Sequence, residues 1–192
     1  VYDGSGLFSA ARVWWTFRLM GKTDVAVLDG GLPKWVAEGR PVNDDDPVIR
    51  DRHMTVTRQN NLVKDVTQVA RAAKLGDHVI VDARAAERFR GEVPEPRPGL
   101  RSGHIPGARN VPYKTLLNAD GTMKDIAAQR KVFMAAGVDL SKPVITSCGS
   151  GVTAAVLSLA LEWIGKRDHS IYDGSWSEWG MYADLPIATG EP

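Results

Sequence analysis

The sequence predicts an α/β fold in which a parallel sheet carries helices on both faces. Apolar strand patterns at 78–81 and 143–147 and a further strand pattern at 169–172 alternate with segments of helical periodicity. Turn residues separate the segments, and strands that alternate with helices pair in parallel. We therefore expect a buried sheet between two helical layers.

The first part of the chain predicts a helix over 9–20, a strand over 25–28 and a second helix near Trp35. A polar, turn-rich stretch follows at 43–47 and is typical of a linker. Beyond it, the residues of 55–57 favour an edge strand.

The middle of the chain predicts a helix over 64–74, because apolar residues recur there at helical spacing. The strand at 78–81 comes next, followed by a loop over 91–107 that is rich in proline and glycine. A further helix is expected over 124–136, with Gly137 just beyond its end, where glycine is favoured.

The last part predicts the strand at 143–147, a strongly apolar helix over 152–164 and the strand at 169–172. Ser175 is a residue type that caps helices, so we expect it to cap a short helix that runs through Trp179.

Composition excludes several classes of protein. The 192 residues carry a net charge of +1, which argues against binding of nucleic acid. No apolar run is long enough to span a membrane, and no signal-peptide pattern opens the chain, so we expect a cytoplasmic protein without membrane partners. The only cysteine is Cys148, which excludes an internal disulfide and a cysteine-based zinc site. We expect no metal and no cofactor.

A repeat with an offset of 144 residues organises the chain. Residues 21–24 (GKTD) recur at 165–168 (GKRD), and Asp29-Gly30 recurs at 173–174. The pattern predicts one supersecondary unit present twice, although two unrelated pieces with common turn residues remain an alternative. We expect part of a first domain at 1–42, a linker at 43–58 and a complete domain at 59–192. The first unit's opening strand would then lie before Val1.

Cys148 stands between an apolar strand and a helix, in a tight loop that contains two glycines. Backbone N–H groups and the helix dipole at such a place stabilise an anion, and hence a thiolate. An inert buried thiol is the alternative, because free cysteines are often buried. The loop favours a nucleophile.

The loop CGSGVT at 148–153 resembles the active-site loop of the 3-mercaptopyruvate sulfurtransferases, within the rhodanese superfamily. Further motifs agree in order: 81–84 (VDAR), 88–91 (RFRG), 94–97 (PEPR), 103–108 (GHIPGA) and 172–176 (YDGSW). The resemblance implies a rhodanese-like domain with a five-stranded parallel sheet, preceded by the C-terminal part of an inactive sister domain.

The resemblance also implies a reaction (EC 2.8.1.2). Cys148 would take sulfur from 3-mercaptopyruvate as a persulfide, release pyruvate and pass the sulfur to a thiol acceptor such as thioredoxin or a small dithiol, or to cyanide. Backbone amides of Gly149, Gly151, Val152 and Thr153 would hold the thiolate, the persulfide and the substrate. Arg88 and Arg97 match the residues that bind the α-keto acid in similar enzymes, and a guanidinium suits those oxygens.

Ser150 would bond the substrate carbonyl or join a proton relay; a simple turn residue is the alternative. In related enzymes this serine is grouped with an Asp and a His of the N-terminal domain, which would precede Val1 here. A separate chain that supplies these residues is then a possible partner.

The residues after the cysteine also separate this chain from relatives with other substrates. The neutral Gly149-Ser150 pair favours mercaptopyruvate over thiosulfate, because thiosulfate sulfurtransferases usually carry basic residues there. Ala154 stands at the position where phosphatases of the same fold need an arginine, so phosphatase chemistry is not expected.

Several other residues are expected to have structural rather than catalytic roles. His104 is expected to be packed and hydrogen-bonded rather than a general base, and Asp82 and Arg84 to tie the sheet end to nearby loops. The six tryptophans are expected in the core and domain interface, with Trp176 a weak candidate for the pocket mouth. The alternative functions are a thiosulfate sulfurtransferase and a non-catalytic rhodanese-type interaction module.

Overall fold

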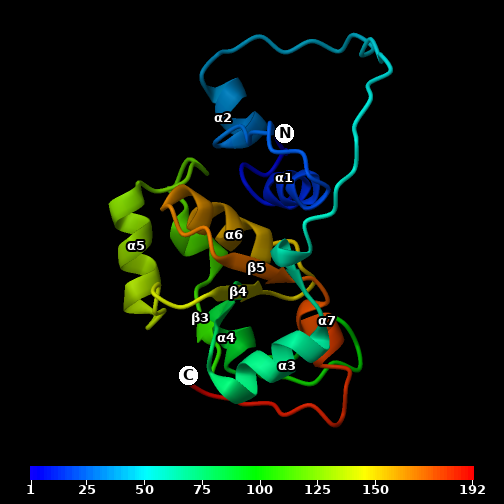
Figure 1. The fold of residues 1–192 in the computed structure, drawn as a ribbon. Coiled ribbons are helices and arrows are strands. Elements are labelled where there is room, and N and C mark those ends of the chain that lie inside the picture. The colour runs from blue at the N-terminus through cyan, green and yellow to red at the C-terminus, as the bar shows by residue number, and fades with distance from the viewer.

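A computed structural model describes residues 1–192 (Figure 1). The α-helices are α1 (Ala10–Leu19), α2 (Gly31–Ala37), α3 (Val66–Leu75), α4 (Ala86–Phe89), α5 (Ile126–Ala135), α6 (Ala154–Trp163) and α7 (Ser175–Trp179). The strands are β1 (Val63–Lys64), β2 (Val79–Asp82), β3 (Arg109–Asn110), β4 (Val144–Ser147) and β5 (His169–Tyr172). Short 3-10 turns cover Asn60–Leu62 and Tyr113–Leu116.

The five strands form one sheet in the order β1-β5-β4-β2-β3, and every pairing is parallel. The sheet confirms the predicted fold class. Each of β4 and β5 is buried along its whole length, as expected for central strands of a parallel sheet that is covered on both faces.

Helices cover both faces of the sheet. On one face, α6 packs against β4 and β5 and in turn carries α1. The opposite face holds α3, α4 and α7 in a second cluster that includes Phe89, Trp176 and Trp179 (Figure 1). Because the apolar residues divide into these two clusters, the sheet has a separate hydrophobic core on each side.

The N-terminal helix is part of the larger core. Trp14, Trp15 and Leu19 of α1 are buried in the same cluster as the apolar residues of α6. The helices also repeat the sequence offset: α1 and α6 begin and end 144 residues apart, and α2 and α7 begin 144 residues apart. The division into domains at 1–42, 43–58 and 59–192 stays a prediction.

Two predicted strands do not form. Residues 25–28 are not a strand, because no neighbouring strand pairs with them; their one backbone partner distant in sequence is Val1, which bonds Ala26 and Leu28. Residues 55–57 are exposed and not a strand; Thr57 bonds the end of α1 instead, and the edge strand is β1. Trp163 is 46% exposed, so not every tryptophan is in a core.

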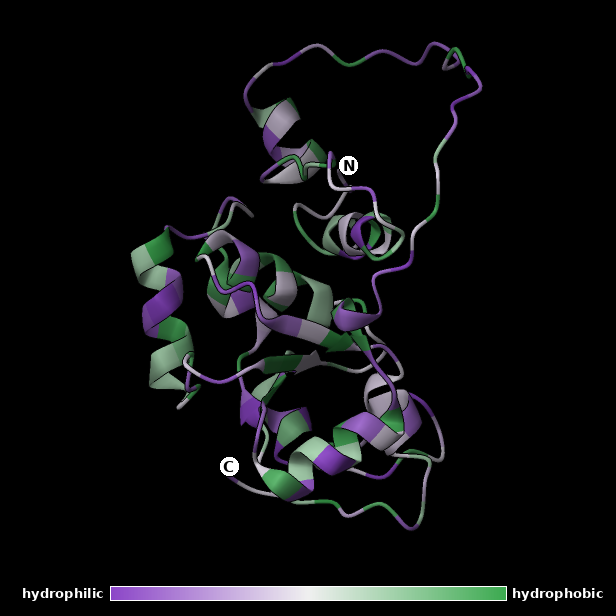
Figure 2. Cartoon of the chain, viewed as in Figure 1, coloured by the Kyte–Doolittle hydropathy of each residue, from purple (hydrophilic) through white to green (hydrophobic).

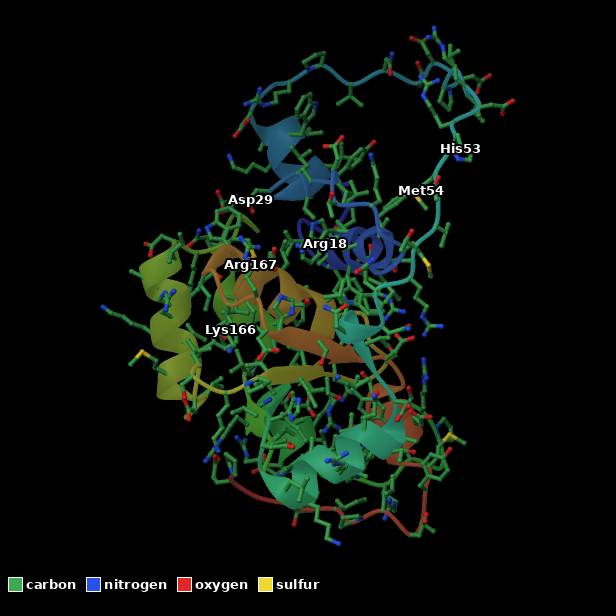
Figure 3. The ribbon with its side chains drawn as sticks, viewed as in Figure 1. Arg18, Asp29, His53, Met54, Lys166 and Arg167 are labelled. Atoms are coloured by element: carbon green, nitrogen blue, oxygen red, sulfur yellow. The ribbon has the colours of Figure 1, made fainter.

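The segment between α2 and β1 runs as an arc away from the packed body and is largely hydrophilic (Figures 1 and 2). His53 and Met54 lie on this arc (Figure 3). None of the helices combines the length and the apolar character that a membrane-spanning helix requires.

Candidate functional site

Cys148 directly follows β4, and the loop 148–153 leads into α6, as the sequence predicts. The residue is 2% exposed, and its thiol is free. The backbone N–H of Gly151 donates to Cys148 Sγ over 3.1 Å. Deprotonation of the thiol would strengthen this hydrogen bond, because hydrogen bonds to charged acceptors are stronger than those to neutral ones.

The backbone of the cysteine loop is anchored on α7. The N–H of Trp176 donates to the carbonyl of Cys148, and the N–H of Ser177 donates to that of Gly149, both at 2.9 Å. Amide and carbonyl point in opposite directions across a planar trans peptide. The N–H groups of Gly149 and Ser150 therefore point away from α7, and neither has an acceptor within the protein.

A cavity of about 580 Å³ opens beside the cysteine. Seven of the eight predicted site residues line it: Arg88, Arg97, Cys148, Gly149, Ser150, Val152 and Thr153. Gly151 is the exception; it is buried and reaches the site through its amide on the sulfur. The structure thus brings together side chains from the loop after β2 and from the loop after β4, at the carboxyl ends of adjacent parallel strands.

Arg88 is held by a carboxylate that sequence reasoning did not assign to the site. Glu95 accepts from Arg88 Nη2 at 2.6 Å and from Arg84 Nη1 at 2.8 Å, and its side chain is 1% exposed. Arg84 also pairs with Asp82 at 2.7 Å. Burial alone would lower the pKa of Arg84, but these two carboxylates raise it above its ordinary value. The chain of charges fixes the guanidinium of Arg88 next to the cysteine loop.

The proximity of Arg88 to the loop explains the glycine at 149. A side chain there would begin 3.1 Å from Arg88 Nη2. Arg97 and Lys114 also line the cavity, and neither has an acidic side chain within ion-pair distance. Because Asp82 and Glu95 already balance Arg84 and Arg88, these two cations give the cavity its excess positive charge.

None of the four histidines lines the cavity. His104 is 1% exposed, stacks on Phe89 with ring centroids 3.8 Å apart and bonds the Phe89 carbonyl through Nδ1. Desolvation lowers the pKa of His104. This confirms a packed histidine, and Asp82 and Arg84 likewise tie the sheet end to Glu95 and to the Gly103 carbonyl.

Two predictions around α7 are wrong. Ser175 does not cap the helix; its hydroxyl instead accepts from the N–H of Cys148 and donates to the Tyr172 carbonyl. Trp176 does not line the cavity. Its side chain is buried, and the guanidinium of Arg84 covers one face of its ring, with the guanidinium carbon 4.5 Å from the ring centroid.

The fold and the site together define a class: an α/β domain with a cysteine in an amide-rich loop and arginines beside it. The family model described as the rhodanese-like domain matches residues 65–182. The chain therefore belongs to the rhodanese family.

Curated relatives have similar sequences. The chain is 44% identical to the 3-mercaptopyruvate sulfurtransferase of Escherichia coli K12, over 97% of this chain and 66% of that protein. It is 41% identical to thiosulfate/3-mercaptopyruvate sulfurtransferase 1 of Arabidopsis thaliana, over 100% of this chain and 56% of the relative. It is 43% identical to the thiosulfate sulfurtransferase of Rattus norvegicus, over 93% and 61%. The chain thus spans 56–66% of the length of these relatives.

Solved structures agree with the fold. The Tum1 protein of Saccharomyces cerevisiae superposes with a TM-score of 0.89 at 31% identity, covering 100% of this chain and 69% of that one. The 3-mercaptopyruvate sulfurtransferase SseA of Escherichia coli gives 0.82 at 40% identity, covering 93% and 66%.

Proposed function

We propose that this chain transfers sulfur from 3-mercaptopyruvate to a thiol or to cyanide through a persulfide on Cys148. The observation that carries the proposal is the position of the thiol: at the cavity, with the Gly151 amide on its sulfur and Arg88 beside its loop. Relatives named 3-mercaptopyruvate sulfurtransferase at 44% and 40% identity support the donor.

The first half-reaction moves one sulfur atom. The Cys148 thiolate attacks the sulfur of the donor, an S–S bond forms, and the C–S bond breaks with its electron pair left on carbon. The resulting enolate takes a proton and leaves as pyruvate. Arg88 and Arg97 would bind the carboxylate and the adjacent carbonyl, which stabilises the enolate that develops there. Ser150, exposed at the rim, would bond the same carbonyl or relay the proton.

The second half-reaction restores the enzyme. A thiolate (thioredoxin or a small dithiol) or cyanide attacks the outer sulfur, and Cys148 leaves as the thiolate. The amides of Gly149, Ser150, Val152 and Thr153 have no acceptor within the protein, so they are available to the sulfur anions of both steps.

Thiosulfate is the second candidate donor. Two observations favour it: the unpaired cations Arg97 and Lys114 in the cavity, and the 43% identity to a thiosulfate sulfurtransferase. The neutral Gly149-Ser150 pair in the loop favours mercaptopyruvate. Thiocyanate formation from cyanide with each donor compares them: we expect the larger kcat/KM with mercaptopyruvate, and an equal or larger value with thiosulfate would reverse the assignment.

Mass spectrometry tests for the persulfide directly. Exposure to mercaptopyruvate without acceptor should add one sulfur, about 32 Da, to the wild-type chain and nothing to a Cys148→Ser variant with an unchanged circular dichroism spectrum. A wild-type chain that gains no sulfur would instead support a non-catalytic interaction module.

A further inference from the structure

A residue far from the cysteine in sequence contacts the cysteine loop. Arg12 lies on α1, outside the residues that the family model matches. Its Nη1 donates to the carbonyl of Gly151 at 3.2 Å and to Asp173 Oδ1 at 2.5 Å. The guanidinium carbon also lies 4.7 Å from the ring centroid of Trp15. The guanidinium is therefore fixed by an acid, an aromatic ring and the loop itself.

The contact with Gly151 determines where the next amide points. No peptide bond in the chain is cis. Because the carbonyl of Gly151 faces Arg12, the N–H of Val152, across the same planar peptide, faces the opposite way. Val152 lines the cavity, and its amide has no acceptor within the protein.

Arg12 completes a set of three anchored carbonyls. The amides of α7 hold the carbonyls of Cys148 and Gly149, and Arg12 holds that of Gly151. Each anchored carbonyl directs the following N–H away from its anchor. A cation on a carbonyl also polarises the peptide, which makes its N–H a stronger donor.

The packing around Gly151 leaves this contact little freedom. A Cβ at this position would lie 2.7 Å from Arg12 Nη1 and 2.8 Å from the Asp173 carbonyl oxygen, and the backbone φ is +81°. The arginine, the aspartate and the loop therefore hold one another in a single arrangement.

We infer that Arg12, held by Asp173, is a positioning residue for the cysteine loop: it fixes the peptide between Gly151 and Val152 so that the Val152 amide serves the sulfur anions on Cys148. The inference rests on the proposed function, since the thiolate and the persulfide are the species that this amide would stabilise. It assigns a role in the chemistry to a helix that precedes the rhodanese domain.

The test compares Arg12→Gln and Asp173→Asn with a matched control, Arg18→Gln. Arg18 lies on the same helix (Figure 3), but its guanidinium pairs with Glu162 at 2.8 Å and stacks over Trp14, and it makes no hydrogen bond or ion pair with the cysteine loop. Because Cys148 is the only cysteine, alkylation by iodoacetamide reports on it alone.

Two readouts separate positioning from docking of α1. In Arg12→Gln and Asp173→Asn, we expect the pH midpoint of alkylation to rise. We also expect single-turnover persulfide formation to slow by about 10-fold, a smaller loss than removing a hydrogen-bond donor outright causes. Arg12→Lys, which keeps the charge, should recover part of both and remains informative if Arg12→Gln folds poorly. Arg18→Gln should keep wild-type values for both.

The inference is overturned if Arg12→Gln keeps both wild-type values, or if Arg18→Gln loses as much, which would mean that α1 acts only through packing. A wild-type chain that forms no persulfide contradicts the proposed function instead. The alkylation profiles then still decide whether Arg12 acts on the thiolate.

Discussion

The hydroxyl of Ser175 accepts a hydrogen bond from the backbone N–H of Cys148 at 3.2 Å and donates one to the Tyr172 carbonyl at 2.9 Å. A single buried side chain thus links the ends of two adjacent strands, β4 and β5, at the point where the cysteine loop begins. Ser175 adopts a positive φ of 52°, the only residue other than glycine to do so. The backbone is strained where this bond forms.

Replacing Ser175 with alanine should leave the buried amide of Cys148 without an acceptor. Such a loss costs about 1–3 kcal/mol of unfolding free energy, which urea denaturation measures. Ser177→Ala is the matched control, because that hydroxyl bonds only the Gly174 carbonyl in its own turn. Equal stability of the Ser175→Ala and Ser177→Ala variants would mean that the bond from the Cys148 amide to Ser175 does not stabilise the fold.

Glu95→Gln should destabilise the fold and weaken donor binding together. The change removes the buried charge that pairs with Arg84 and Arg88, and breaking a buried pair costs about 3–5 kcal/mol. The KM for mercaptopyruvate should rise as Arg88 loses its anchor. Glu92→Gln, at an exposed pair with Arg90, should change neither quantity. An unchanged KM in Glu95→Gln would mean that Glu95 has only a structural role.

The two loop glycines should respond differently to alanine. At Gly149 the new methyl meets only the guanidinium of Arg88, at 3.1 Å, and no backbone atom, so Gly149→Ala should fold normally but raise the KM by displacing that guanidinium slightly. At Gly151 it meets the clamped Arg12 and the Asp173 backbone at positive φ, which costs about 1–2 kcal/mol from the backbone alone. Gly151→Ala should therefore lower both the melting temperature and kcat. The reverse order of effects would contradict this geometry.

His169 should make stability depend on pH. Desolvation, assisted by the nearby charges of Arg18 and Arg167, lowers the pKa of His169 to about 4. Its ring bonds Ser158 and Glu162, and Arg18 and Arg167 meet on the same glutamate (Figure 3). A folded-state pKa below the unfolded one means that the unfolded chain binds the extra proton first.

The contribution of neutral His169 to the free energy of unfolding is therefore complete above about pH 6.5. It is lost as the pH falls toward 4, and the loss is at most about 3 kcal/mol. Urea denaturation between pH 4 and 7 measures it, and His169→Gln should flatten the curve relative to wild type. An identical slope in the variant would exclude His169 as the source.

Lys114→Gln should affect a dianionic donor more than a monoanionic one. The side chain adds an unpaired positive charge to the cavity, so its removal should raise the KM for thiosulfate several-fold and that for mercaptopyruvate less. Lys131→Gln, at an exposed position on α5, makes the same change in net charge and should leave both constants unaltered. An equal rise of the KM for both donors would mean that Lys114 does not bind the second negative charge of thiosulfate.

The sequence by itself determined the fold class and most of the helices and strands, which follow from periodicity and turn residues. The strand–loop–helix junction around a lone cysteine also predicted Cys148 as a nucleophile, whereas Arg88 and Arg97 were predicted only from the resemblance of their motifs to a known family. The strands predicted at 25–28 and 55–57 were wrong because a strand exists only where the tertiary fold supplies a partner.

Only the tertiary structure decided what holds the site in place. Glu95 lies between two arginines in sequence, but its burial and its pairing with Arg84 depend on packing. Ser175 bonds a residue 27 positions away, and Arg12 pairs with an aspartate 161 positions away. Such contacts leave no periodicity in the sequence, because their geometry arises only after the sheet has brought its strand ends together.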